Sequence, residues 1–280
     1  MQAALSPDGF SDSLSMLQWH VEMGVDLCIE ETPQAAIRAP SVTAELSPVP
    51  PASLPPLPAA RPASAPLAET VPALAAAIAE ARALADAATS LEALEQAVRA
   101  FNGCPLKKTA TSTVFAQGAA QSRLMFIGEA PGADEDRQGA PFVGVSGQLL
   151  DLMLSHIGLR RADNFYITNT LFWRPPGNRQ PTLDELEICR PFVEKHIALV
   201  KPHTLVLVGG TATKALLNDT RGITRLRGQQ FTYKNDYMAD AVPVHVLYHP
   251  SYLLRQPLAK KQAWADLLAL KAALDARLSA

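Results

Sequence analysis

Four polar segments of this chain combine turn-forming residues with side chains that can bind or activate a ligand. They are Gly128–Gly144, Thr168–Arg179, Gly209–Lys214 and His249–Arg255. The amide of Asn169 can read a polar ring edge as donor and acceptor at once. The phenyl ring of Phe142 can stack on a flat ligand. The imidazole of His249 can donate a hydrogen bond to a developing anion. Together these groups suit a planar, polar ring.

Each of these residues also has a structural alternative. Phe142 could be a buried loop residue, and Asn169 could cap the end of a strand. His249 could simply precede a capped helix, because Pro250 suits the first helical position. The first segment is no phosphate-binding P-loop, since acidic residues flank its glycines and no Lys-Ser/Thr pair follows.

A short apolar run precedes each polar segment and predicts a strand. The four runs are Arg123–Ile127, Phe165–Ile167, Thr204–Val208 and Val242–Tyr248. Helical patterns follow them at Gln148–Ile157, Leu183–Val200, Ala212–Leu217 and Lys260–Leu278. This alternation predicts an α/β fold, a three-layer α/β/α domain around a mostly parallel four-stranded sheet. Parallel sheets place their chemistry at the carboxyl ends of the strands, so the polar segments should form one rim.

The N-terminal part of the chain has a different composition. Ser11–Glu31 has the spacing of a short helical arm, which could dock on a partner protein or pack back on the body. Pro40–Leu67 has nine prolines and no glycine, which favours an extended tether. Val71–Ala88 and Ser90–Phe101 predict two helices. We therefore expect an arm (1–39), a disordered Pro/Ala-rich linker (40–68) and a folded domain (69–280).

Charge divides the chain in the same way. Residues 1–100 hold 4 basic and 12 acidic residues, and residues 101–280 hold 21 and 15. A basic body favours a polyanionic partner, although a solvated charged surface would look the same. Three sparse cysteines give no disulfide framework and suit a reducing cytoplasm. We expect neither a signal peptide nor a membrane span.

Five motifs follow one another within Gly103–Leu274: GEAPGADED, PFVGVSGQLLD, YITN, RPPGNRQPT and HPSYLLR. In this order and spacing they resemble the family 4 uracil-DNA glycosylases. The resemblance implies a monomeric bacterial repair enzyme, cytoplasmic and associated with the nucleoid. Its partner would be DNA that contains uracil. The enzyme would release the uracil base and leave an abasic site. It also implies that Phe142 stacks on uracil, that Asn169 pairs with its O4 and N3 edge, and that His249 acts at O2.

The resemblance implies further roles in the first loop. Glu135 would lie near C5 and exclude the thymine methyl group, and the backbone around Ala130 and Gly132 would bind the base. Ala130 stands where other branches of the superfamily carry a water-activating Asp or Asn. Glu129 and Glu135 are therefore the candidate activators, unless the reaction is largely dissociative.

DNA contacts are expected from a set of basic side chains and one apolar side chain. The basic candidates are Arg174, Arg179, Lys214, Arg225, Arg227 and Arg255. Leu253 would correspond to a wedge that fills the hole left by the extruded nucleotide. Two rival functions stay open: a module that binds uracil or abasic DNA without turnover, and an enzyme acting on free nucleotides.

The chain departs from the family in its cysteines. Family 4 members usually bind a 4Fe-4S cluster through four cysteines. Here Cys104 and Cys189 keep two of those places, whereas Phe101 and Trp173 occupy the other two. Two thiolates cannot supply the four that such a cluster needs, and Cys28 could add one at most. We therefore predict no cluster, no other cofactor and no metal.

Overall fold

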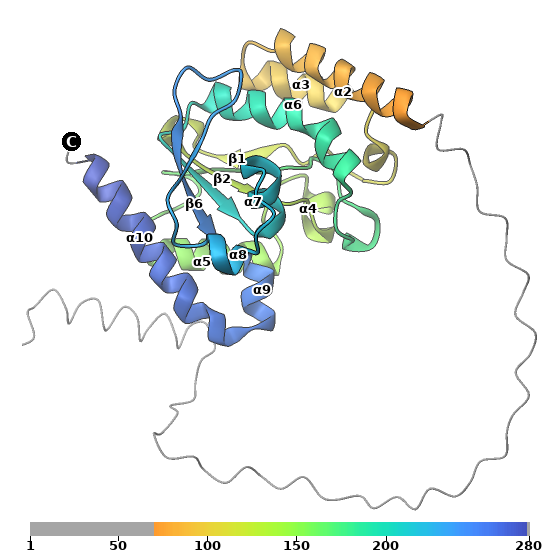
Figure 1. The fold of residues 1–280 in the computed structure, drawn as a ribbon. Helices are drawn as coiled ribbons and strands as arrows, with labels where there is room; N and C mark the ends of the chain where they lie inside the picture. The colour runs from red at the N-terminus through yellow and green to blue at the C-terminus, as the bar shows by residue number, and fades with distance from the viewer. Residues whose placement is uncertain (1–69, 279–280) are drawn as a thin grey trace, which may run out of the picture.

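The computed structural model describes residues 70–278 (Figure 1). The predicted N-terminal arm and the proline-rich segment lie outside the described residues, so these two predictions stay untested.

A six-stranded sheet forms the middle layer. Its strands are β1 (Ala116–Gly118), β2 (Leu124–Gly128), β3 (Tyr166–Asn169), β4 (Thr204–Val208), β5 (Phe231–Tyr233) and β6 (Val242–Leu247). The spatial order is β1-β3-β2-β4-β6-β5. The inner four strands run parallel to one another, and each edge strand runs antiparallel to the inner strand beside it.

The inner strands are the four that the sequence predicts, so the predicted fold class is confirmed. The predicted number of strands was wrong, because the sheet has six. The two extra strands have three residues each. So short a strand shows no clear alternation of apolar and polar residues.

Helices cover both faces of the sheet (Figure 1). On one face lie α2 (Thr70–Ala87), α3 (Leu91–Ala100) and α6 (Leu183–Val200), and on the other lie α5 (Val145–Ser155) and α10 (Lys260–Leu278). Shorter helices are α4 (Ala133–Gln138), α7 (Gly210–Leu217), α8 (Ile223–Leu226) and α9 (Pro250–Arg255). The predicted helices are confirmed to within three residues at each end. Among the described residues, no helix combines the length and the apolar character that crossing a membrane requires.

The central strands form because every residue of β2 and β4 is buried. Side chains alternate between the two faces of a strand. Met125 and Ile127 therefore pack under α6, whereas Leu124 and Phe126 pack in the core against α5 and α10. Burial on both faces is typical of parallel strands between helical layers.

All four parallel strands end at the same edge of the sheet. Gly128 at the end of β2 lies opposite Asn169 at the end of β3. At the end of β4, the main-chain N–H of Gly209 donates to the Leu247 carbonyl of β6 across 2.9 Å. His249 follows two residues later. The four polar segments therefore meet, as the sequence predicts.

Candidate active site

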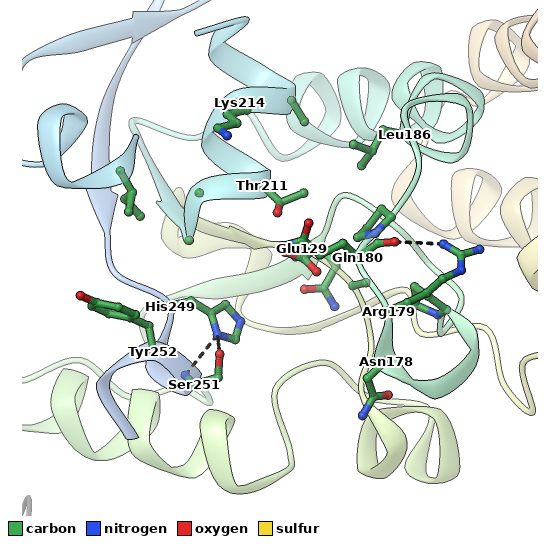
Figure 2. Close-up of a pocket in the computed structure, with 18 of the residues that line it drawn as sticks. Glu129, Asn178, Arg179, Gln180, Leu186, Thr211, Lys214, His249, Ser251 and Tyr252 are labelled. Atoms are coloured by element: carbon green, nitrogen blue, oxygen red, sulfur yellow. Dashed lines mark hydrogen bonds between the residues drawn. The ribbon is translucent and has the colours of Figure 1, made fainter. Parts of the chain in front are cut away.

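A cavity of about 800 Å³ opens at this edge of the sheet, and all four polar segments line it (Figure 2). It brings together ten of the residues singled out from the sequence. They are Glu129, Ala130, Gly132, Glu135, Phe142, Asn169, Arg179, Lys214, His249 and Arg255. Four others do not line it: Arg174, Arg225, Arg227 and Leu253.

Asn169 lines this cavity and carries an unused hydrogen-bond acceptor. The residue is only 2% exposed, and its Oδ1 has no hydrogen-bond partner among the described residues. Buried polar side-chain atoms are nearly always paired, and an unpaired one needs an explanation. A ligand that donates a hydrogen bond here would supply the missing partner.

Phe142 lies beside that acceptor. A methyl group added at Gly128 would come within 2.3 Å of Phe142 Cζ and 2.6 Å of Asn169 Oδ1. The ring and the amide therefore share the space above Gly128, which only a glycine leaves open. The ring centroids of Phe142 and His249 are 5.9 Å apart, with their planes inclined by 34°. One small planar ligand could therefore touch all three side chains.

The proton position of His249 follows from its contact with Ser251. His249 precedes α9, and its Nδ1 lies 3.2 Å from the main-chain nitrogen and 2.7 Å from the hydroxyl of Ser251. A main-chain N–H can only donate, so Nδ1 must accept and carries no proton. The proton of the neutral ring is then on Nε2. Figure 2 shows that side of the ring turned away from Ser251 and toward the middle of the cavity.

Burial keeps His249 neutral. Burial, with a smaller contribution from the positive charge of Arg255, lowers the pKa of His249 to about 4, although the Glu135 carboxylate acts in the opposite direction. At neutral pH the side chain is therefore a neutral hydrogen-bond donor through Nε2. Gly209 lies directly against it, because a methyl group there would be 3.0 Å from His249 Cβ.

The two glutamates of the first loop differ in what they bind. Glu135 Oε1 accepts hydrogen bonds from the main-chain N–H groups of Val143 (2.9 Å) and Gly144 (2.8 Å). Its Oε2 accepts from Gly132 across 3.0 Å. Within residues 70–278, no such bond is made by the carboxylate of Glu129, which lies in the cavity (Figure 2). Glu135 therefore joins two loops, and Glu129 is the carboxylate that is available to a water molecule.

Comparison with known proteins agrees with this geometry. The family model "Uracil DNA glycosylase superfamily" matches residues 115–268, which include the whole sheet and every segment of the cavity. The chain belongs to the uracil-DNA glycosylase superfamily. It is homologous to type-4 uracil-DNA glycosylases, so the expected resemblance is confirmed.

The type-4 relatives are similar over most of their length. The enzyme of Archaeoglobus fulgidus is 36% identical over 181 residues, which are 63% of this chain and 89% of that protein. The enzyme of Thermotoga maritima is 36% identical over 166 residues, which are 59% of this chain and 83% of that protein. A DNA polymerase of Bacillus phage SP01 is 26% identical over 180 residues, but these are only 18% of that protein.

The basic residues that are expected to contact DNA differ in whether their charge is free to bind a phosphate. Lys214 and Arg255 line the cavity and are exposed, and neither forms an ion pair within the described part of the chain. Arg179 also lines the cavity but forms a two-point ion pair with Glu185, at 2.5 and 2.9 Å. Lys214 and Arg255 are therefore the free cations of the rim.

Three other arginines fit the expected DNA contact less well. The guanidinium of Arg227 binds Asp266 at 2.8 Å and lies outside the cavity, so it is less available to DNA than expected. Arg174 donates to the Asn178 side chain at 2.7 Å. Arg225 is exposed but outside the cavity.

Leu253 does not lie at the surface, where a wedge for the base stack would have to be, so its expected role stays a prediction. Leu253 is 0% exposed and packs in the core shared with α5 and α10, whereas Leu254 is 44% exposed. Successive residues of a helix point about 100° apart, so only one of the two can face the core. The sequence shows both leucines but does not fix the phase of α9.

The residues at positions 101, 104, 173 and 189 do not fit the 4Fe-4S cluster that family 4 members usually bind. Cys104 and Cys189 are buried, and hydrogen bonding of the Cys189 thiol to Cys104, together with burial, raises the pKa of Cys189 well above its usual value. Phe101 and Trp173 are also fully buried, with ring centroids 6.4 Å apart. No group of three or more metal-binding side chains occurs within residues 70–278. Aromatic rings thus fill the space of two ligands.

Two residues of this site were not predicted from the sequence. Ser251 lies inside the HPSYLLR motif, so its position next to His249 was a usable signal. Arg190 of α6 lines the cavity and pairs with Glu187 at 2.6 Å. It lies in an ordinary helical pattern, and nothing local distinguishes it.

Proposed function

We propose that this chain hydrolyses the N-glycosidic bond between uracil and deoxyribose in DNA. The products would be free uracil and an abasic site. The observation that carries the proposal is the unpaired, buried Oδ1 of Asn169, which shares one cavity with Phe142 and His249. Membership of the family supports the same substrate.

Recognition follows from the donor and acceptor pattern of the base. Uracil N3–H would donate to Oδ1 of Asn169, and uracil O4 would accept from its Nδ2. Cytosine presents the opposite pattern at both positions, so it would leave both groups of the amide unpaired. An unpaired buried group costs about 1–3 kcal/mol, which disfavours cytosine. Phe142 would stack on the ring.

Bond cleavage places negative charge on the base. When the C1′–N1 bond breaks, its electron pair leaves with uracil and the charge is shared with O2. Nε2–H of His249 would donate to O2 and stabilise that anion. One positioned donor of this kind is typically worth about 10²–10³ in rate. Its proton position is already set by Ser251.

Water completes the reaction at the sugar. Loss of the base leaves an oxocarbenium-like sugar, and a water molecule adds to C1′. The carboxylate of Glu129 would take the proton that this water loses. The released uracil anion takes up a proton from solvent and Glu129 returns its proton to solvent, so that one water molecule is consumed for each bond broken.

The base must leave the DNA stack before it can enter this cavity, at a cost of a few kcal/mol. Lys214 and Arg255, the free cations of the rim, would bind backbone phosphates on either side of it. The exposed Leu254 would occupy the vacated space in the stack. Arg179 would contribute only after rearranging its ion pair with Glu185.

A labelled oligonucleotide with one uracil tests the proposal. The full-length protein should release free uracil, and Asn169→Ala and His249→Gln should each lower the single-turnover rate by about 10²-fold or more. His203→Gln is the matched control, since His203 binds Arg123 at the opposite end of β4. A retarded protein–DNA complex without any free uracil would instead favour a binding module, and full activity of Asn169→Ala would refute the site.

A further inference from the structure

The aromatic residue of the site has an unusual backbone. Phe142 has φ of +55°, in the left-handed region that side chains rarely adopt. Such a conformation persists only where the surroundings hold it in place. Part of that support is α5, since a methyl group at Gly147 would lie 1.9 Å from the Phe142 carbonyl oxygen. Close packing alone, however, does not fix where the two neighbouring carbonyls point.

Arg161 fixes both carbonyls. Its Nη1 donates to the Pro141 carbonyl at 2.5 Å, and its Nη2 donates to the Phe142 carbonyl at 2.8 Å. The two acceptors are therefore held on the two arms of one planar group. Arginine presents several donors in a rigid fork, and lysine does not.

The guanidinium is itself held from two sides. It forms an ion pair with Asp151 of α5 at 2.9 Å, and Nη1 also donates to Gln117 of β1 at 2.8 Å. Its side chain is 13% exposed. Arg161 does not line the cavity, so it has no contact with a bound base.

We propose that Arg161 is a positioning residue that holds the strained Phe142 backbone, and through it the ring that stacks on the base. This inference rests on the proposed function, because it assigns Phe142 the role of stacking on uracil. Without Arg161, the loop would relax toward an ordinary backbone conformation. The ring would then leave the space above Gly128.

A double-mutant cycle tests the inference with the full-length protein. Single-turnover uracil release is measured for the wild type, Arg161→Gln, Phe142→Ala and the double variant. Arg161→Gln should be about 10- to 100-fold slower, because small misplacements of a site can cost that much. It should cost nothing further in the Phe142→Ala background. Losses that multiply would show that Arg161 does not act through Phe142, and would overturn the inference.

Binding and control variants separate positioning from folding. Arg161→Gln should keep wild-type affinity for abasic-site DNA, which carries no base for Phe142 to hold, and a loss of that affinity would contradict the inference. Lys107→Gln is the control, since Lys107 also donates to two carbonyls, Arg99 (2.5 Å) and Phe101 (2.8 Å), outside the cavity. It should keep the wild-type rate.

Two milder changes cover the case in which Arg161→Gln does not fold. Arg161→Lys should recover part of the rate, and Asp151→Asn should lower it less than the removal of Arg161. Wild-type rates in both would overturn the inference. A wild-type protein that releases no uracil would instead overturn the proposed function, and this inference with it.

Discussion

Gly128 and Asn169 are register partners on β2 and β3, and the Asn169 amide fills the space that a side chain at Gly128 would need. Gly128→Ala should therefore displace the amide, the Phe142 ring or both. We expect uracil release to fall by roughly 100-fold and the free energy of unfolding by about 1–3 kcal/mol. Gly222→Ala is the control, since its nearest neighbour would be 3.8 Å away. Equal rates for the two variants would contradict this packing.

Glu129 and Glu135 should respond differently to loss of charge. Glu129→Gln removes the carboxylate that could accept a proton from water, so the rate should fall by about 10²–10⁴ while the unfolding midpoint stays unchanged. Glu135→Gln weakens three hydrogen bonds to main-chain N–H groups. Its free energy of unfolding should fall by about 1–3 kcal/mol. If Glu129→Gln keeps the full rate, the reaction needs no base and the role of Glu129 is refuted.

The two leucines of α9 should also separate. Leu254→Ala should lower the rate on duplex DNA more than on a single strand, because only a duplex leaves a stacked hole to fill. Leu253→Ala should mainly lower the free energy of unfolding, by about 2–5 kcal/mol, since Leu253 is a core residue. Rates on both substrates and denaturant midpoints decide the question. A duplex-specific defect in Leu253→Ala alone would restore the original assignment of the wedge.

Buried histidine makes folding stability depend on pH. An unfolded histidine has a pKa near 6.5, whereas burial lowers the pKa of His249 to about 4. Between these values the unfolded chain takes up a proton that the folded chain does not. Stability is therefore lost as the pH falls below about 6.5, by about 1.4 kcal/mol per pH unit for this residue. Denaturant unfolding at pH 5, 6 and 7 should show a shallower dependence for His249→Gln, and identical slopes would contradict the burial argument.

The Cys104 region should hold no iron. The purified protein should lack both visible absorbance and stoichiometric iron, and Cys104→Ala with Cys189→Ala should keep the wild-type rate of uracil release. This follows because only two thiols remain where four thiolates are needed. Four iron atoms per chain would overturn the prediction.

The sequence predicted the central fold well because β2 and β4 carry a strong local signal. Every residue of these two strands is buried, so apolar runs bounded by turns identify them. α6 begins at the predicted residue because Thr182 and Glu185 form a reciprocal cap. The sequence indicates a loop where α4 lies, because glycine, proline and acidic residues surround it. Its first turn carries three acidic residues, which suit a helix N-terminus.

The composition of the site was predictable, but its internal support was not. Asn169 ends β3, His249 follows β6, and Phe142 lies in the long segment after β2, so their convergence follows from topology. Arg161 is 19 residues from Phe142, whose carbonyl it binds, and no local sequence pattern predicts such a contact. The ion pairs of Arg179 with Glu185 and of Arg227 with Asp266 could not be predicted from the sequence either, because they depend on which side chains meet after folding.

The side chains that we propose to contact the base come from the ends of three different strands, β2, β3 and β6, or from the segments after them, and no two of them are neighbours in the chain. A fragment of the domain should therefore not keep part of the proposed activity. If the chain turns over uracil-DNA as proposed, the rate should disappear in step with global unfolding, because it depends on the whole sheet.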